Sequence, residues 1–212
     1  MSPEPEAQSL ALAAILCGGR ASRMGTDKAL VTLGGLPLVE RVRAQVQGLV
    51  GRVVAVGGSS AVSRLGFDMV PDRYPGANSM GGIATALGYA RECCGEGSWV
   101  LALACDLPFL EPRLLAHLAD LRSGHDVVVP RVAAGYEPLC ALYRTTCLPT
   151  MEELIHQDHL RIITVFDRVR TREVEETELR RFDPGLCSFI NLNRPEDLER
   201  ARQLVELETR EG

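Results

Sequence analysis

Residues 10–28 read LALAAILCGGRASRMGTDK, and this stretch decides the fold class. Leu10 to Leu16 form an uninterrupted apolar run, which ends at Gly18-Gly19. A short apolar run bounded by glycine is typical of a strand that is buried on both faces of a parallel sheet. We therefore predict a central strand here, followed at its carboxyl end by a glycine-rich loop.

Beyond this stretch, strand patterns alternate with helical patterns up to about residue 130. The predicted strands are 52–56, 67–70, 99–104 and 126–129, and the predicted helices are 37–50, 82–92 and 111–122. Such alternation indicates an α/β fold with a mostly parallel sheet and helices on both faces. The remaining third is less regular, with strands at 139–143 and 169–175, and helices at 146–157 and from 195 to about 207.

The chain has 212 residues, a length that favours one large domain over two small ones. Its 46% apolar and 24% charged residues describe a globular protein with a sizeable core. We assign a single domain to residues 10–206 and expect disordered tails at 1–9 and 207–212. We expect no membrane span, because no apolar run approaches the ~20 residues that one requires.

Charge and cysteine usage narrow the class of protein further. A net charge of −5 argues against general nucleic-acid binding, which needs a basic face. The seven cysteines are odd in number, and residues 1–9 lack the pattern of a secretion signal. Together these features favour the reducing environment of the cytoplasm.

Lys28 is the only lysine among 23 lysine and arginine residues, and it ends the glycine-rich loop. Glycine lets the backbone approach a ligand and direct successive N–H groups at an anion. Lysine is a compact point charge, whereas arginine is a rigid planar fork. The functional interpretation is a phosphate clamp on a nucleotide. The alternative is a solvated lysine beside an ordinary turn.

Two aspartates also follow predicted strands, at the edge where ligands bind in open α/β sheets. Asp72 follows strand 67–70 and is suited either to a base or sugar contact or to capping a turn. Asp106 follows the most apolar strand, 99–104. A carboxylate there needs a partner, which Mg²⁺ would supply, unless Asp106 instead caps the next helix. Phosphoryl or nucleotidyl transfer fits this set, because that chemistry needs mainly positioning and charge neutralisation.

Residues Leu16 to Lys28 resemble the Leu-x-Gly-Gly-x-x-x-Arg-Met-Gly-x-Asp-Lys signature of molybdenum cofactor guanylyltransferases. Later segments are similar to later family segments in the same order: Asp72 to Gly76, Gly81-Gly82, Asp106 to Phe109, Glu137 to Tyr143 and Asn191 to Leu198. The similarity runs from about Leu12 to Leu204. It implies a three-layer, Rossmann-like nucleotidyltransferase that joins GMP from GTP to the terminal phosphate of molybdopterin and releases pyrophosphate.

The resemblance also implies residue roles and partners. GTP would be held by Leu16, Cys17, Gly18, Gly19, Lys28 and Asp72. Asp106 would bind Mg²⁺ and touch the nucleotide, while Asn191, Asn193, Gly82 and Arg23 would lie toward molybdopterin. Lys28, Asp106 and Arg23 would be the catalytic residues. Molybdenum-insertion proteins and apo-molybdoenzymes would be partners.

Other functions remain open at this point. Related cytidylyltransferases resemble Leu-Ala-Ala-Gly where this chain has Leu16-Cys17-Gly18-Gly19, so Gly18 favours the larger guanine. The alternatives are a molybdopterin cytidylyltransferase, a sugar-phosphate nucleotidyltransferase and a non-catalytic nucleotide-binding scaffold in cofactor delivery. The chain departs from the family at Asn78-Ser79-Met80, where many relatives read Gly-Pro-Leu, and at Arg194, where threonine is common. It also lacks an asparagine around Ala55 to Gly58.

Overall fold

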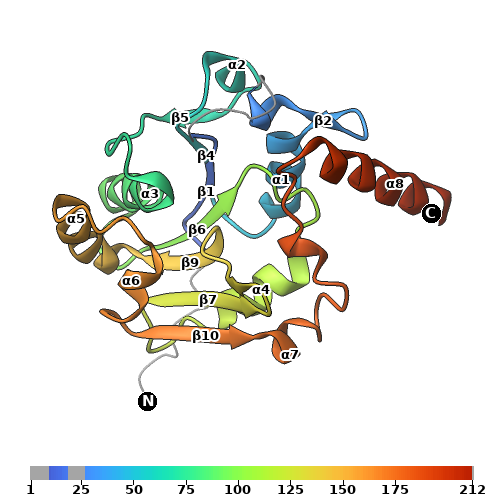
Figure 1. Ribbon diagram of the computed structural model, residues 1–212. Coiled ribbons are helices and arrows are strands. Elements are labelled where there is room, and N and C mark those ends of the chain that lie inside the picture. The colour runs from blue at the N-terminus through green and yellow to red at the C-terminus, as the bar shows by residue number, and fades with distance from the viewer. Residues whose placement is uncertain (1–9, 19–26, 212) are drawn as a thin grey trace.

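The structure, a computed structural model, describes residues 10–18 and 27–211, with side chains up to residue 205. Within these residues the main feature is a mixed sheet with helices on both sides (Figure 1). The strands lie in the order β5 (Asp68–Val70), β4 (Val53–Val56), β1 (Leu12–Leu16), β6 (Trp99–Ala104), β9 (Cys140–Arg144), β7 (Val127–Val132) and β10 (Thr171–Glu175). Strand β8 (Gly135–Tyr136) pairs with β7, and β2 (Thr32–Leu33) pairs with β3 (Leu36–Pro37) in a separate ribbon.

The strand order changes direction at β1. From β1 the chain runs outward through β4 to β5, and then crosses to β6 on the other side of β1. Strand β1 is parallel to both neighbours, with Leu16 opposite Val56 on one side and Ala104 on the other. Ligands of open α/β sheets bind beyond the carboxyl ends of the strands at such a point. The fold therefore places the ends of β1 and β6 where chemistry is expected.

Two helical layers enclose the sheet (Figure 1). On one side lie α1 (Leu38–Val46) and α4 (Pro112–Asp120), and on the other lie α3 (Asn78–Cys94), α5 (Leu148–His156) and α6 (Ile163–Phe166). Side chains of β1 alternate between the two cores. Ile15 packs in the core with α1 and α4, whereas Leu12 and Leu16 pack in the core with α3 and α5. All residues of β1 are buried, as the apolar run predicts.

The C-terminal third completes the edge of the sheet. It contains η2 (Thr145–Cys147), α7 (Glu176–Leu179), η3 (Cys187–Phe189) and α8 (Pro195–Glu211). Leu192, Leu198 and Ala201 pack with Leu33 and Leu38 in a small third core. This packing places the segment before α8 against β2 and the start of α1. The shorter helices η1 (Lys28–Leu30) and α2 (Ser60–Ser63) lie in the first half.

The α/β class and the mostly parallel sheet are confirmed, and the predicted strands and helices lie within a few residues of the observed ones. Three helix boundaries are wrong. Helix α1 ends at Val46 rather than at Val50, because a turn follows it and Val50 pairs with Leu10 in a bridge. Helix α3 begins at Asn78 rather than at Gly82, because the turn before it closes earlier, with Ala77 N–H donating to the Tyr74 carbonyl at 3.0 Å. Helix α8 continues to Glu211, into the segment expected as a tail. Among the described residues, no helix is long and apolar enough to cross a membrane.

Candidate active site

Lys28, Asp106 and Asn193 meet at the carboxyl ends of β1 and β6. The Lys28 ammonium donates to the Asp106 carboxylate and, at 2.7 Å, to Oδ1 of Asn193. The Asp106 side chain is 12% exposed and that of Lys28 is 27% exposed. A carboxylate so little exposed requires a positive partner, and Lys28 supplies it. Three residues that the sequence analysis assigned separately therefore form one cluster.

The position of Lys28 is set by the two residues beside it. Asp27 caps η1, where its Oδ1 accepts the Ala29 N–H at 3.1 Å. Ala29 is fully buried in the core beneath this turn. Because its neighbours are held by a cap and by packing, Lys28 projects from a fixed backbone.

The position of Asp106 follows from the buried strand before it. Cys105 N–H donates to the Leu16 carbonyl at 3.4 Å, which extends the β1–β6 pairing by one step. The Asp106 carbonyl accepts the Leu192 N–H at 3.2 Å. Leu107, the next residue, is 1% exposed. These contacts anchor the backbone on both sides of the carboxylate.

Asn193 is held by the start of α8. Oδ2 of Asp197, in the first turn of α8, accepts the N–H of Asn193 at 3.0 Å and that of Arg194 at 2.8 Å. This is the carboxylate half of a capping box. The other half, a hydroxyl at position 194 that accepts an N–H of the first turn, is missing because this chain has arginine where threonine is common. Asn191, two residues earlier, is half-buried and donates to the Phe189 carbonyl at 3.3 Å.

The loop after β1 lies against the loop after β4. A Cβ at Gly57 would lie 3.0 Å from the Gly18 Cα, and one at Gly58 would lie 2.9 Å from the Cys17 Cβ. Both glycines also have positive φ, of +68° and +85°. A side chain at either position would push the β1 loop away from the sheet. This explains why the chain has glycines here rather than the asparagine of some relatives.

Cys17 contributes its backbone rather than its sulfur. The pKa of its thiol is raised by a hydrogen bond with the Cys105 thiol and by burial. A thiol with a raised pKa stays neutral and is a poor nucleophile. The arrangement does not provide a covalent nucleophile at this position.

Asp72 lies beyond β5 and is exposed. Its Oδ1 accepts from the Tyr74 N–H at 2.9 Å and from the Thr85 hydroxyl at 3.2 Å, so it caps the turn before α3. Thr85 is fully buried and also accepts the Arg73 N–H at 3.0 Å. Thr85 was not predicted as part of the site, because a single threonine inside an apolar helix does not stand out in the sequence. The contact of Asp72 with GTP stays a prediction.

Gly82 was expected to start a helix, but the helix begins four residues earlier, at Asn78. It lies inside the first turns of α3, where a Cβ would meet Leu16 Cδ2 at 2.7 Å. Its observed role is to let α3 approach the end of β1. A contact with molybdopterin stays a prediction, and the residues Gly19 and Arg23 lie outside the described part of the chain.

The neighbouring Gly81 provides a test of this packing. A Cβ at Gly81 would lie 2.7 Å from the Tyr74 carbonyl oxygen, whereas one at Gly88 would lie 2.8 Å from the Arg73 guanidinium, which pairs with the exposed Glu92. Gly81→Ala must move backbone, and we expect it to lower the free energy of unfolding by about 2 kcal/mol. Gly88→Ala displaces only a guanidinium and gains helix propensity, so we expect a change below about 1 kcal/mol. Urea unfolding of both variants checks this, and equal losses would contradict it.

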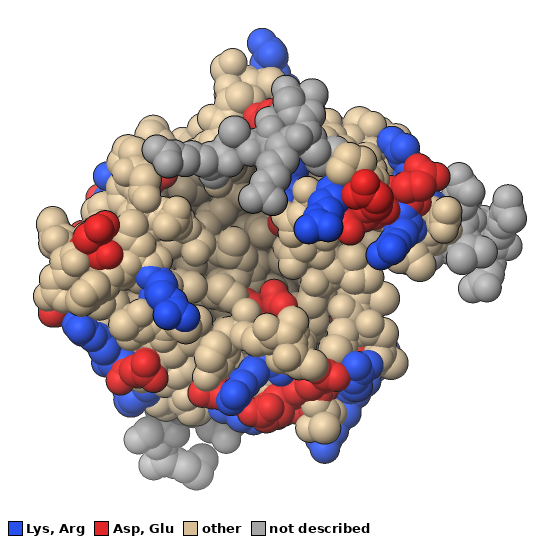
Figure 2. All heavy atoms as spheres, viewed as in Figure 1, with Lys and Arg blue, Asp and Glu red and all other residues tan. Residues whose placement is uncertain are grey.

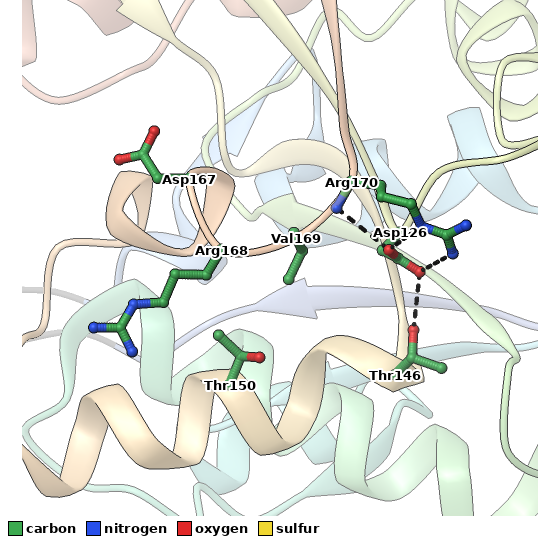
Figure 3. A pocket seen from close by; sticks show the side chains of 7 residues that line it. All are labelled: Asp126, Thr146, Thr150, Asp167, Arg168, Val169 and Arg170. Atoms are coloured by element: carbon green, nitrogen blue, oxygen red, sulfur yellow. Dashed lines mark hydrogen bonds and ion pairs between the residues drawn. The ribbon is translucent and has the colours of Figure 1, made fainter.

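A cavity of about 490 Å³ lies elsewhere, between α5 and the segment before β10 (Figure 3). Asp126 and Arg170 on its wall precede β7 and β10, so it lies at the opposite end of these strands from Asp106. Arg170 donates to the Asp126 carboxylate at 2.8 and 2.9 Å, and the same contact lowers the pKa of Asp126. Asp126, Arg168 and Arg170 are paired within the protein, and the cavity lies away from Lys28 and Asp106, so we do not assign the chemistry to it.

The face viewed in Figure 1 is hollowed at its centre, over the middle of the sheet, and charged side chains stand mainly around the rim (Figure 2). A concave region with few charges can enclose the ring systems of a nucleotide or a cofactor. The cluster of Lys28 and Asp106 provides the charges that phosphate chemistry requires.

Comparison with known proteins agrees with this geometry. The family model described as "MobA-like NTP transferase domain" matches residues 13–172. The "Probable molybdenum cofactor guanylyltransferase" of Pelotomaculum thermopropionicum is 34% identical over 91% of this chain and 92% of its own length. The "Molybdenum cofactor guanylyltransferase" of Desulfosudis oleivorans is 34% identical over 90% of this chain and 94% of its own.

A solved structure gives the same result. The crystal structure of molybdopterin-guanine dinucleotide biosynthesis protein A from Archaeoglobus fulgidus superposes with a TM-score of 0.79 at 30% identity. The match covers 92% of this chain and 99% of the other. With these similarities over nearly its whole length, the chain is a nucleotidyltransferase and belongs to the molybdenum cofactor guanylyltransferase family.

Proposed function

We propose that this protein transfers GMP from GTP to the terminal phosphate of molybdopterin, forming the guanine dinucleotide cofactor and pyrophosphate. The observation that carries the proposal is the contact between Lys28 and Asp106 at the switch point of the sheet. It places a cation and a carboxylate together at the carboxyl ends of β1 and β6. The relatives named above share this chain's length and fold. We further propose that the reaction takes place in the cytoplasm and that molybdenum-insertion proteins or apo-molybdoenzymes receive the product.

The chemistry needs charge neutralisation more than proton transfer. A phosphate monoester oxygen attacks the α-phosphorus of GTP, the new P–O bond forms, and the bond to pyrophosphate breaks on the opposite side. Both reactants are polyanions, so the Lys28 ammonium offsets their repulsion and the charge on the leaving group. The phosphate is already a nucleophile at neutral pH. A general base is therefore unnecessary, and the described cluster contains no histidine.

The donor set fits Mg²⁺. No group of three or more histidine, cysteine, aspartate or glutamate side chains suited to a metal occurs in the described residues. Mg²⁺ is commonly held by one or two carboxylates together with substrate phosphates and water. Asp106 would be the protein ligand, and the ion would supply Lewis-acid neutralisation of the phosphate oxygens. Lys28, released from Asp106, would then be free to contact phosphate. On the acceptor side we propose Asn191, Asn193 and Arg23.

The guanine preference is tested at Gly18. A Cβ at this position would meet the Gly57 Cα at 3.6 Å, an ordinary contact, so the described neighbours of Gly18 accommodate Gly18→Ala. We expect the wild type to bind GTP more tightly than CTP by isothermal titration with Mg²⁺. Gly18→Ala should weaken GTP binding about 10-fold and leave CTP binding unchanged, because the methyl group occupies space near the purine edge. Tighter binding of CTP by the wild type would place the protein among the cytidylyltransferases.

A further inference from the structure

Glu137 lies at the same edge of the sheet as Asp106. It follows β8 in the turn that leads to β9. In this turn the Leu139 carbonyl accepts the N–H of Ala104, the last residue of β6, at 2.9 Å. Asp106 follows Ala104 by two residues. The turn and the catalytic carboxylate therefore share the carboxyl end of β6.

The Glu137 carboxylate has acceptor capacity that the protein does not use. It is half-buried, and its oxygens accept no hydrogen bond and form no ion pair within residues 10–18 and 27–205. Burial raises the pKa of Glu137 to about 7. A desolvated carboxylate without a donor is costly to keep.

Two other carboxylates, one buried and one half-buried, contrast with Glu137. Asp183 accepts the N–H groups of Cys187 at 3.0 Å and Ser188 at 2.8 Å. Glu173, on the adjoining strand, accepts from the Tyr136 hydroxyl at 2.7 Å and from Arg131 at 3.0 Å. Carboxylates that stabilise the fold thus have their donors. The Glu137 carboxylate is therefore a candidate acceptor for a hydrogen-bond donor on a bound ligand.

The backbone around Glu137 is rigid. Its N–H donates to the Pro130 carbonyl at 2.9 Å, and its carbonyl accepts the Cys140 N–H at 3.1 Å. The Tyr143 hydroxyl donates to the carbonyl of Pro138 at 2.9 Å. These hydrogen bonds fix the backbone from which the Glu137 side chain projects.

The topology assigns Glu137 to the acceptor side of the site. The β1 loop and Asp72 lie with β1, β4 and β5, on the nucleotide side of the switch point. Glu137 lies with β9 and β7 on the other side. The segment that carries Asn191 reaches the site at Asp106, whose carbonyl accepts the Leu192 N–H at 3.2 Å. A carboxylate would repel the phosphate of the acceptor. It would be attracted to the part of the acceptor that carries N–H donors.

We propose that Glu137 recognises the pterin ring of the acceptor, a specificity contact that rests on the proposed function. The pyrimidine ring of a pterin presents a ring N–H beside an exocyclic amino group. The two oxygens of a carboxylate match such a planar pair of donors. Glu137 thereby orients the acceptor so that its phosphate points toward Lys28 and Asp106.

Glu137→Gln tests the contact, because it preserves shape and replaces one acceptor oxygen by a donor. We expect the KM for molybdopterin to rise about 10- to 100-fold, with the KM for GTP and the unfolding midpoint nearly unchanged. Glu173→Gln is the matched control, since it makes the same change at a carboxylate of the adjoining strand that has its own donors. It should leave both KM values within about 2-fold of the wild type.

A second readout reports on the amino group itself. The phosphate esters of 6-hydroxymethylpterin and of 6-hydroxymethyllumazine differ at position 2, where the lumazine carries an oxygen instead of an amino group. We expect the pterin ester to compete with molybdopterin at least about 10-fold better in the wild type, and this ratio to approach unity in Glu137→Gln. A change in folding alone would weaken both competitors equally.

The outcomes separate the two proposals. If the wild type transfers GMP to molybdopterin and Glu137→Gln changes neither the acceptor KM nor the competitor ratio, the inference about Glu137 is overturned. A rise in the KM for GTP instead would assign the carboxylate to guanine and overturn it as well. If the wild type transfers no GMP to molybdopterin, the proposed function fails and the pterin contact fails with it.

Discussion

We expect Asp106→Ala to lower kcat for GMP transfer by about 10³-fold, because it removes the carboxylate proposed to hold Mg²⁺ at the reacting phosphates. GTP binding weakens much less, since the β1 loop and Lys28 remain. The variant is expected to fold, because Lys28 is partly exposed and water replaces its lost partner. Steady-state release of pyrophosphate, measured against the Mg²⁺ concentration, checks the effect.

Asp126→Asn is the control for Asp106. Asp126 is also a little-exposed carboxylate that pairs with a cation, but it lies at the opposite end of the strands. Its loss removes contacts with Arg170 and Thr146, so we expect lower stability and unchanged kcat per folded molecule. If Asp106→Ala kept near-normal turnover with Mg²⁺, the assignment of Asp106 would be wrong.

Lys28→Ala lowers kcat/KM for GTP by about 10²- to 10³-fold, because no other described cation contacts Asp106. We expect Lys28→Arg to be impaired to a similar degree as Lys28→Ala, although it keeps the positive charge. A guanidinium is a planar fork that pairs bidentately with a carboxylate, so it would stay with Asp106 instead of turning to phosphate. The same pyrophosphate assay, run on both variants, measures this difference.

The comparison between alanine and arginine separates charge from geometry. If Lys28→Arg retained most of the wild-type kcat/KM, a positive charge alone would suffice, and the exchange of Lys28 between Asp106 and phosphate would be contradicted. Unfolding midpoints of both variants, expected to lie near that of the wild type, exclude a loss caused by misfolding.

The fold was largely predictable because the buried strands leave a simple pattern. Leu12 to Leu16 and Trp99 to Ala104 are buried along their entire lengths, so each reads as an apolar run. The alternation of these strands with helices predicts a parallel sheet but not the strand order, so the switch point at β1 was not predicted. The start of α3 at Asn78 was not predictable in the same way, because a hydrogen bond between Ala77 and Tyr74 sets it.

Site residues could be predicted where a charged residue stands at a position that the packing of the core does not require. Lys28 and Asp106 were found because a lone lysine and an aspartate after an apolar strand are unusual. Their contact with Asn193 spans 165 positions of sequence and depends on the third core, which local patterns do not reveal. Thr85 acts through a buried hydroxyl, and Gly82 lets α3 pack closely against Leu16. In the sequence, both look like ordinary residues of a helix interior.

The most direct test follows the α-phosphate of GTP. The purified protein is incubated with Mg²⁺, molybdopterin and GTP labelled at the α-phosphorus, and the products are separated. The proposed function predicts that the label moves into a molybdopterin-guanine dinucleotide, with one pyrophosphate released for each dinucleotide formed. If the label stayed in GTP or appeared only in free GMP or GDP, while the protein bound both substrates, guanylyl transfer by the Lys28–Asp106 site would be contradicted.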